Sequence, residues 1–291
     1  MTQVVAHEKL DDPHPPTYRL ASLEAIQSTL NLVASLKHKV FVVKLGGSTL
    51  EYQQAVLQDC IWLHELGVNV VVVHGGGPLI TAWLDKLHIP TSFEQGLRVT
   101  DAQTLEVVRM VLCGQINQDL VTQASEMGGN VVGLCGTDNK MVQAHIANER
   151  LGLVGEIDRV DVSLLTHLID LGYLPIIAPL GLGPEGICLN INADLVAARL
   201  AGALNAERLI FLSDVNGIRS ADGTHLSELN KAEVSSLIED GTIYGGMIPK
   251  ITACLNALAN VARVHIANGN TPHVLLYELE DHPHVGTTIT R

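Results

Sequence analysis

The sequence predicts an α/β fold: a three-layer αβα sandwich with a mainly parallel central sheet. Along most of the chain, short apolar runs alternate with longer amphipathic stretches, which is the order of strands and helices in a parallel sheet covered on both faces. Two of the runs, Val40–Val43 and Val70–Val73, contain no polar residue, as expected for strands buried on both sides. Each run leads through glycines toward a helical stretch, which is typical of a βαβ unit.

The N-terminal stretch is expected to lie outside this sandwich. Residues 1–20 contain the run DDPHPP at 11–16 and no periodicity, so we expect a mobile tail there. In residues 21–36 an amphipathic helix is indicated by apolar residues at spacings of three and four, at Leu20, Leu23, Ile26, Leu30, Val33 and Leu36. We therefore expect a tail and helix over residues 1–38 and the main domain over 39–291.

Strands and helices then follow one another along the main domain. Strands are expected at 40–44, 68–73, 130–134, 173–178, 207–212, 263–267 and 286–290, with a β-rich region at 140–160. Helices are expected at 51–66, from Pro78 onward, and at 101–127, 161–171, 192–203, 231–239 and 248–260. Because ligands of parallel sheets bind beyond the carboxyl ends of the strands, the loops 44–48, 74–78 and 213–219 are the candidates for a site.

Composition limits the function classes. The chain has 291 residues, a formal net charge of −13 and a pI near 5.4, which argues against nucleic acid as a partner. Its apolar runs are shorter than the ~20 residues of a membrane span, and the N-terminus lacks the apolar core of a secretion signal. We therefore expect a cytoplasmic protein. The five cysteines form no CxxC pair, and we expect small core residues at Cys60, Cys113, Cys135, Cys188 and Cys254.

The stretch VFVVKLGGS at residues 40–48 carries the strongest signal for a site. Lys44 stands at a strand end, and Gly46-Gly47 can present bare N–H groups to a ligand before the next helix begins, so the stretch is suited to hold phosphate. A tight turn with an exposed lysine is the alternative. The second stretch VVVVHGGGP, with Gly75, Gly76 and Gly77, repeats the same design and favours the phosphate interpretation.

Other polar residues extend this candidate site. Lys250 follows GGMIP near a probable helix start, where the helix end is positive. In the run NINAD, Asn192 is expected to cap a helix, while Asp194 is free to hold lysines in place. Arg98, in GLR, is suited to clamp a carboxylate, although a surface arginine is the alternative for this residue taken alone.

Two glycine-rich motifs give only weak support to other functions, and a third is absent. GLGPEG at 181–186 fits a dinucleotide fingerprint, but an extended ICLNI follows it and Pro184 interrupts it, so a β-hairpin turn is favoured. HGGG at 74–77 fits an esterase oxyanion loop, but the chain has no GxSxG. No GxxxxGK[ST] is present, which excludes a P-loop enzyme.

The motifs together resemble those of acetylglutamate kinases of the amino-acid kinase family. KLGG, VVHGGGP, GLRVTDAQTLEVV, LNINAD, LSDVNGI and GGMIPK occur in the family's order over about residues 40–291. GLRVTD joined to LNINAD is specific to acetylglutamate kinase, whereas KLGG and HGGG are shared with carbamate kinase and aspartokinase relatives. The resemblance implies ATP-dependent phosphorylation of the side-chain carboxylate of N-acetyl-L-glutamate, a step of arginine biosynthesis. It also implies an amino-acid lobe over 39–205 and a nucleotide lobe over 206–291.

The same resemblance assigns roles residue by residue. It implies catalytic roles for Lys44, Lys250 and Asp194, the last of which would orient the lysines. It implies that the acetylated substrate is bound by Gly76, Gly77, Arg98 and Asn190. It implies that the nucleotide is bound by Gly47, Asp214, Val215, Asn216, Gly217, Ile218, Arg219, Thr242, Ile243 and Tyr244. ATP would bring Mg²⁺, held mainly by its own oxygens and water, and no protein ligand is assigned to the ion.

The chemistry agrees with these parts. A glutamate side chain has a pKa of ~4.3 and is already a nucleophilic anion at pH 7, so no general base is needed. The difficulty is to bring an anion up to a polyanion, and lysines, N–H groups and Mg²⁺ answer it. Two alternatives stay open: a kinase for a related acid such as a modified aminoadipate, and a non-catalytic amino-acid-sensing protein on the same fold.

Regulation by arginine is also suggested by resemblance. The N-terminal helix is similar to the extension that interlaces arginine-inhibited acetylglutamate kinases into hexamers, and the C-terminal residues His265, Gly269 and Glu278 are similar to their arginine-binding end. Lys37 stands where that subgroup carries an aromatic residue, and KLGG replaces its usual KYGG or KFGG. We therefore expect a homo-oligomer, dimer or hexamer, with L-arginine as a candidate inhibitor. The alternative is a helix that only caps its own domain.

Overall fold

The computed structural model describes residues 23–47, 53–245, 247–279 and 285–291. The chain divides into two compact units, Met1–Leu36 and Lys37–Arg291. In the first unit, α1 spans Leu23–Leu36, close to the predicted helix, while the predicted tail at 1–20 lies outside the described residues. Leu23 and Leu30 of α1 are 85% and 64% exposed, so part of the predicted apolar stripe faces solvent.

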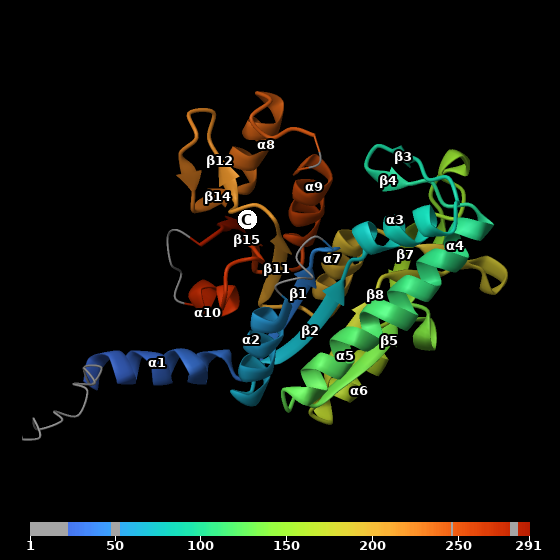
Figure 1. Ribbon diagram of the computed structural model, residues 1–291. Helices are drawn as coiled ribbons and strands as arrows, with labels where there is room; N and C mark the ends of the chain where they lie inside the picture. The colour runs from blue at the N-terminus through green and yellow to red at the C-terminus, as the bar shows by residue number, and fades with distance from the viewer. Residues whose placement is uncertain (1–22, 48–52, 246, 280–284) are drawn as a thin grey trace, which may run out of the picture. The chain divides into compact units, whose positions relative to one another are not determined.

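The second unit is built on one large sheet (Figure 1). Its described strands lie in the order β14-β16-β15-β11-β1-β2-β8-β5, and every neighbouring pair is parallel except β15–β16. The strands are β1 (Val40–Leu45), β2 (Asn69–His74), β5 (Val131–Cys135), β8 (Leu174–Ala178), β11 (Arg208–Ser213), β14 (Glu228–Asn230), β15 (Arg263–Asn268) and β16 (Thr287–Thr290). The mainly parallel sheet predicted from sequence is confirmed.

Helices cover both faces of this sheet. On one face α2 (Gln53–Glu65) and α5 (Asn117–Glu126) pack on β2, β5 and β8, and α10 (Val274–Leu279) packs on α2. On the other, α6 (Ser163–Asp170) and α7 (Ala193–Ala203) pack on β8, β1 and β11, and α9 (Met247–Ala257) packs on α7. The predicted three layers are therefore present. Three further helices are α3 (Gly77–Lys86), α4 (Ala102–Arg109) and α8 (Lys231–Glu239).

The two valine runs explain why the sheet is central. Val42, Val71 and Val73 belong to the core cluster that includes residues of α6, α7 and α9. Phe41, Val43, Val70 and Val72, which alternate with them along the strands, are fully buried as well. Because successive side chains of a strand point to opposite faces, this burial requires helices on both sides.

Strand register brings the three candidate loops to one edge. Leu45 at the end of β1 pairs with His74 of β2 and with Leu212 of β11. The three strands are parallel, so the chain leaves all of them on the same side of the sheet. The loops after β1, β2 and β11 therefore meet there, as predicted.

Smaller sheets flank this edge. The GLGPEG run forms the hairpin between β9 (Leu180–Leu182) and β10 (Cys188–Asn190), as predicted, and these strands join β6 (Val142–Ile146) and β7 (Gly155–Val160). Sequence analysis missed the two-residue strands β3 (Phe93–Glu94), β4 (Leu97–Arg98), β12 (Ile218–Arg219) and β13 (His225–Leu226). It also missed β14 and the six-residue α10. Elements this short contain too few residues to show a period.

The predicted helix 101–127 is interrupted by a π-helical segment. Between α4 and α5 lies η2, residues Met110–Ile116. Its side chains Leu112 and Ile116 close over Gly76, where an added Cβ would lie 2.7 and 2.5 Å from their terminal carbons. A side chain at residue 76 would therefore force the ends of the Leu112 and Ile116 side chains to move, which favours glycine in the turn after β2.

A buried histidine ties this turn to the sheet. His74 is fully buried; its Nδ1 donates to Gly75 O at 3.1 Å and its Nε2 accepts from Asn117 Nδ2 at 3.2 Å. Asn117 Nδ2 also donates to Ile176 O at 2.9 Å, which joins α5 to β8. Burial lowers the pKa of His74 to about 4, so the ring is neutral at pH 7.

We expect this histidine to make folding acid-sensitive. Because the pKa of His74 is lower in the folded than in the unfolded chain, its stabilising contribution is complete above pH 6.5 and is lost as the pH falls toward 4. The loss should reach about 3 kcal/mol. Urea unfolding of the wild type and of His74→Asn at pH 7 and pH 4.5 measures it: the variant should be weaker at pH 7 but lose less on acidification. An equal acid loss in both proteins would contradict the assignment.

Candidate active site

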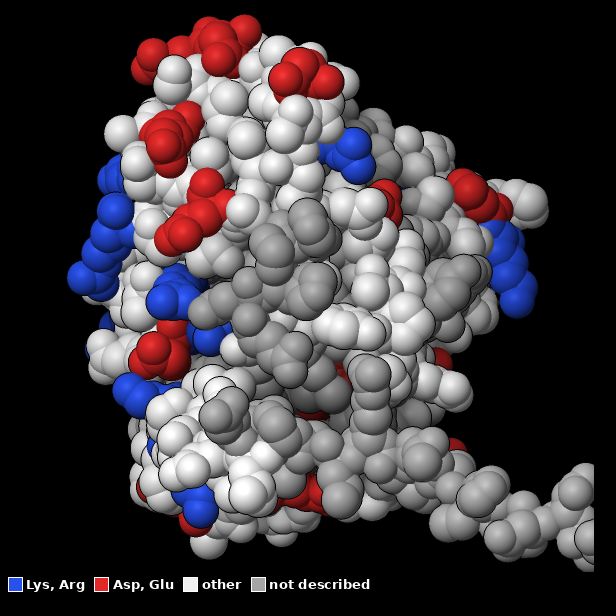
Figure 2. Space-filling view, turned by 90° about the vertical axis from the view of Figure 1, so that its left-hand side faces the viewer, with Lys and Arg blue, Asp and Glu red and all other residues white. Residues whose placement is uncertain are grey.

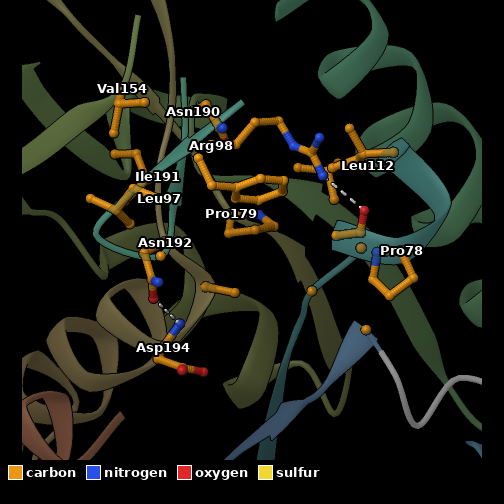
Figure 3. Close-up of a pocket in the computed structure, with 18 of the residues that line it drawn as sticks. Pro78, Leu97, Arg98, Leu112, Val154, Pro179, Asn190, Ile191, Asn192 and Asp194 are labelled. Atoms are coloured by element: carbon orange, nitrogen blue, oxygen red, sulfur yellow. Dashed lines mark hydrogen bonds between the residues drawn. The ribbon is translucent and has the colours of Figure 1, made fainter. Parts of the chain in front are cut away.

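A cavity of about 360 Å³ opens at the carboxyl edge of the sheet, where the loops after β1 and β2 meet (Figure 3). The β3–β4 hairpin and the start of α7 complete its wall. Polar residues that line it are Lys44, Arg98, Asn190, Asn192 and Asp194, together with the glycines 47, 75, 76 and 77. All the predicted catalytic and substrate-binding residues except Lys250 therefore line one cavity, which is large enough for a small amino-acid derivative.

An ion pair forms one end of this cavity. Lys44, only 8% exposed, places its Nζ 2.6 Å from Asp194 Oδ1. Asp194 stands in the first turn of α7, which Asn192 caps by accepting from the backbone N–H of Asp194 and Leu195 at 2.8 and 3.2 Å. The predicted capping role of Asn192 is correct, and the cap fixes the turn from which the Asp194 carboxylate reaches Lys44.

A second lysine shares this carboxylate. Burial lowers the pKa of Lys250, on α9, and the charge of Lys44 lowers it further, whereas Asp194 and Asp214 raise it. The two cations are therefore close enough to repel each other, and the Asp194 carboxylate, which is paired with Lys44, is also near enough to offset part of that repulsion at Lys250. A polyanion bound here would relieve that repulsion and favour the protonated form of Lys250.

The glycine turns add backbone donors without side chains. An added Cβ on Gly47 would lie 2.9 Å from Pro78 Cδ and 3.1 Å from Gly77 N, so the turns after β1 and β2 touch backbone to backbone. Gly76 is the N-cap of α3 and makes no side-chain cap hydrogen bond. Gly76 and Gly77, at the start of α3, line the same cavity as Lys44, an arrangement suited to an anion.

Arg98 stands at the opposite end of the cavity and is held firmly. It is 7% exposed and donates from Nη1 to Thr91 Oγ1 at 2.7 Å, and from Nη2 to Thr81 Oγ1 at 2.8 Å and Gly77 O at 3.0 Å (Figure 3 shows the last of these). Its guanidinium also lies 4.7 Å from the centre of the Phe93 ring. These contacts use three of the five N–H donors of an arginine, so two remain for a ligand.

The supporting residues of Arg98 were missed by sequence analysis. Thr81, Thr91 and Phe93 stand on a helix, a loop and a two-residue strand, and no sequence pattern links them to Arg98. Asn190 is positioned in the same manner: its Nδ2 donates to Thr100 Oγ1 at 3.1 Å. Only the fold shows that both site residues are oriented by threonine hydroxyls.

A second cavity, of about 450 Å³, gathers the predicted nucleotide residues. It lies between the loop after β11 and the segment before α9, and its lining residues are Val215, Asn216, Gly217, Ile218, Arg219, Thr242, Ile243, Tyr244 and Met247. Two of the residues predicted to bind the nucleotide do not line this second cavity. Gly47 lines the first cavity instead, and the charge of Asp214 raises the pKa of Lys250. Asp214 and Gly47 thus stand toward the lysines.

The residues suggested for arginine binding are only partly together. His265 Nε2 contacts Glu278 Oε2, and Arg208 Nη1 lies 3.4 Å from Glu278 Oε1 and donates to Glu278 O at 2.8 Å. All three side chains are buried. Gly269 instead donates its N–H to Ser213 O at the end of β11. The Glu278 carboxylate is therefore already engaged by an arginine of the chain itself.

Metal ligands, membrane-spanning helices and a continuous basic surface were each sought in the described part of the chain. Within the described residues, no three His, Cys, Asp or Glu side chains are placed to hold a metal ion, and no helix is long and apolar enough to cross a membrane. On the face drawn in Figure 2, described Lys and Arg side chains lie as separate groups among Asp and Glu, not as one basic surface.

The chain is similar in sequence to proteins of one known family. Residues 39–268 match the amino acid kinase family. A Campylobacter curvus protein named acetylglutamate kinase is 44% identical over 91% of this chain and 96% of its own length. The Thermosynechococcus vestitus protein of the same name is 41% identical over 92% of this chain and 93% of its own length.

Among solved structures, N-acetylglutamate synthase from Neisseria gonorrhoeae, complexed with coenzyme A and N-acetyl-glutamate, has the same fold. Its TM-score is 0.83 at 24% identity, over 93% of this chain. This chain spans 64% of the length of that synthase. At this identity the likeness concerns the fold alone.

Proposed function

This chain belongs to the amino acid kinase family, and from that premise we propose that it transfers the γ-phosphoryl group of ATP to the side-chain carboxylate of N-acetyl-L-glutamate, forming N-acetylglutamyl 5-phosphate. The observation that carries the proposal is the paired Lys44 and Asp194, with Lys250 in the same field, at one end of a cavity that holds Arg98 at the other. The names of the relatives support the same substrate and a place in arginine biosynthesis.

The geometry performs the transfer mainly by positioning and charge. Arg98 binds the α-carboxylate with its two remaining donors, which directs the side-chain carboxylate toward the lysine end. That carboxylate is ionised at pH 7 and attacks phosphorus without a base. Lys44, Lys250 and the N–H groups of Gly47, Gly76 and Gly77 stabilise the charge that gathers on the transferring phosphoryl oxygens. Asp194 keeps both lysines aimed at the phosphoryl group.

ATP takes the second cavity, between the loop after β11 and the segment before α9. Its triphosphate then extends toward Lys44 and Lys250. Asp214 and Gly47, the two predicted nucleotide-binding residues outside the second cavity, lie on that side. Mg²⁺ supplies charge neutralisation when ATP is bound, and we assign it no protein ligand because ATP oxygens and water meet its preference for octahedral oxygen.

An ADP-release assay with three acids tests the reaction and its alternatives. N-Acetyl-L-glutamate should give the highest kcat/KM, with glutamate and N-acetyl-aminoadipate well below it. A preference for N-acetyl-aminoadipate would replace the proposal with the related-acid kinase. Nucleotide binding without ADP release from any of the acids would favour the non-catalytic sensor.

Replacing either lysine by alanine should lower turnover. If Lys44 and Lys250 each meet transition-state charge, kcat should fall by roughly 10²–10³ in either variant, by analogy with the loss of one oxyanion donor. ATP affinity should weaken much less. Lys231→Ala, on the exposed start of α8, is the matched control and should behave as wild type. Near wild-type turnover in Lys250→Ala would remove this residue from the site.

Exchanging Arg98 for lysine should weaken acceptor binding. Lysine lacks the planar fork that bonds Thr81, Thr91 and Gly77 O at once, so KM for acetylglutamate should rise by roughly 10- to 100-fold, the value of a charged hydrogen-bonded contact. Arg150→Lys, an exposed conservative exchange, serves as the control. A raised KM for ATP with an unchanged KM for acetylglutamate would contradict the role.

We extend the proposal to assembly and feedback. The exposed Leu23 and Leu30 of α1 give a second copy of the chain an apolar stripe to cover, which supports a homo-oligomer. Arginine binding at Glu278 requires its guanidinium to compete with that of Arg208. Light scattering and activity in millimolar arginine, with and without residues 1–36, test both points. An oligomer size that is the same with and without residues 1–36 would contradict assembly through α1, and activity indifferent to arginine would contradict feedback.

A further inference from the structure

Three of the five cysteines lie together, contrary to the sequence-based expectation of scattered core residues. Cys60 and Cys254 are buried as expected, whereas Cys113, Cys135 and Cys188 are only half-buried. Cys113 belongs to η2, Cys135 is the last residue of β5, and Cys188 is the first of β10. Interaction with the Cys135 thiol is the first cause that raises the pKa of Cys113, and the charge of Cys135 adds to burial in raising the pKa of Cys188, so the three thiols are neighbours.

The packing of α5 on β5 explains why Cys113 and Cys135 meet. Asn117 lies against Gly133, where an added Cβ would be 2.2 Å from Asn117 Oδ1. The helix leads into β5 through a short turn, so the two run in opposite directions. One turn back along the helix is Cys113, and two residues forward on the same face of the strand is Cys135. Their pairing is thus a consequence of register.

The two sulfurs have different environments. Cys135 Sγ accepts a hydrogen bond from Thr137 Oγ1 at 3.1 Å, while its backbone N–H donates to Asp138 Oδ2 at 2.7 Å. The donated bonds from Cys113 and Thr137 lower the pKa of Cys135, against the opposing effect of burial. The same bond to Cys135, and then burial, raise the pKa of Cys113. Cys135 is therefore the nucleophile of the pair.

The pair lies next to residues that line the acceptor cavity. Leu112, the neighbour of Cys113, lines that cavity and packs with Ile116 over Gly76. Cys135 pairs with Ala178 of β8, and the next residue, Pro179, lines the same cavity. A covalent bond between Cys113 and Cys135 would join two walls of the acceptor site.

We propose that Cys113 and Cys135 form a redox-active dithiol, which a low-molecular-weight disulfide such as glutathione disulfide oxidises, and that the resulting bond weakens acceptor binding. The Cys135 thiolate attacks one sulfur of the disulfide, forming a mixed disulfide and expelling one thiolate. Cys113 then attacks Cys135 Sγ, gives up its proton to the second departing thiol, and closes the internal disulfide. One reagent disulfide is reduced to two thiols for each bond formed.

The mechanical effect follows from bond length. A disulfide holds its sulfurs at about 2.05 Å, closer than two unbonded sulfur atoms can approach, so closure draws η2 toward β5. Leu112 moves with η2, and the cavity wall over Gly76 shifts. Since small misplacements of positioning groups have large kinetic effects, KM for the acceptor should rise about tenfold, with KM for ATP changed much less.

The test oxidises the full-length chain with glutathione disulfide, counts thiols, and maps cross-linked peptides by mass spectrometry before and after dithiothreitol. The expected result is loss of two thiols, one Cys113–Cys135 peptide, a raised KM for acetylglutamate, and recovery of both on reduction. Cys188→Ser is the matched control and should oxidise as wild type does. Cys113→Ser should stop at a glutathione adduct on Cys135, and Cys135→Ser should leave Cys113 unmodified.

Several results would overturn the proposal. These are a Cys135–Cys188 link in place of the expected one, no cross-link at all, an adduct on Cys113 in the Cys135→Ser protein, and a complete cross-link with unchanged KM. The thiol count and peptide map do not depend on the reaction catalysed. Failure of the kinase proposal therefore remains distinguishable from failure of the dithiol proposal.

Discussion

The ion pair between Lys44 and Asp194 is the constraint on which the rest of the structure depends. A lysine this buried is costly to hold charged unless an opposite charge compensates for the lost hydration. The compensation comes from a residue far away in the sequence, so two distant segments must meet within hydrogen-bond distance. β1 places the lysine by lying between β2 and β11, and the cap at Asn192 places the carboxylate at the start of α7.

The same constraint explains the glycine turns. Because Asp194 balances part of the lysine charge, part of the charge of an anionic ligand has to be met by backbone N–H groups, and these are accessible only where side chains are absent. An added Cβ on Gly47 would press against the backbone of the neighbouring turn, and one on Gly76 would push aside the side-chain ends of Leu112 and Ile116 on η2. The buried bonds of His74 to Gly75 and Asn117 then hold the turn to the sheet beneath it.

The site is therefore preorganised: the residues around it hold its charged side chains in place. Arg98 is oriented by threonine hydroxyls and an aromatic ring before any ligand arrives, which reduces the entropy lost on binding. The cavity wall formed by Leu112 lies in the segment that also carries Cys113, and Pro179 of the same cavity follows Ala178, the strand partner of Cys135. Formation of the proposed disulfide can shift the wall of the acceptor cavity because a close-packed interior transmits strain.

Sequence alone was enough for the layers of the fold, the order of the long strands and helices, and the loops that form the site. Those features depend on local periodicity and on the rule that parallel strands end at one edge, both of which can be read from the sequence. The capping role of Asn192 was also predictable, because capping involves residues only two or three positions apart. The motifs around Lys44 and Lys250 pointed to the same site.

Only the tertiary structure decided which side chains support one another. The hydroxyls that hold Arg98, the meeting of Cys113 with Cys135, and the engagement of Glu278 by Arg208 join residues from separate elements. Such contacts follow from helix register, strand pairing and hairpins whose strands are only two residues long. None of these leaves a periodic signal along the chain. The charges and thiols were visible in the sequence, but their partners were set by the packing of the layers.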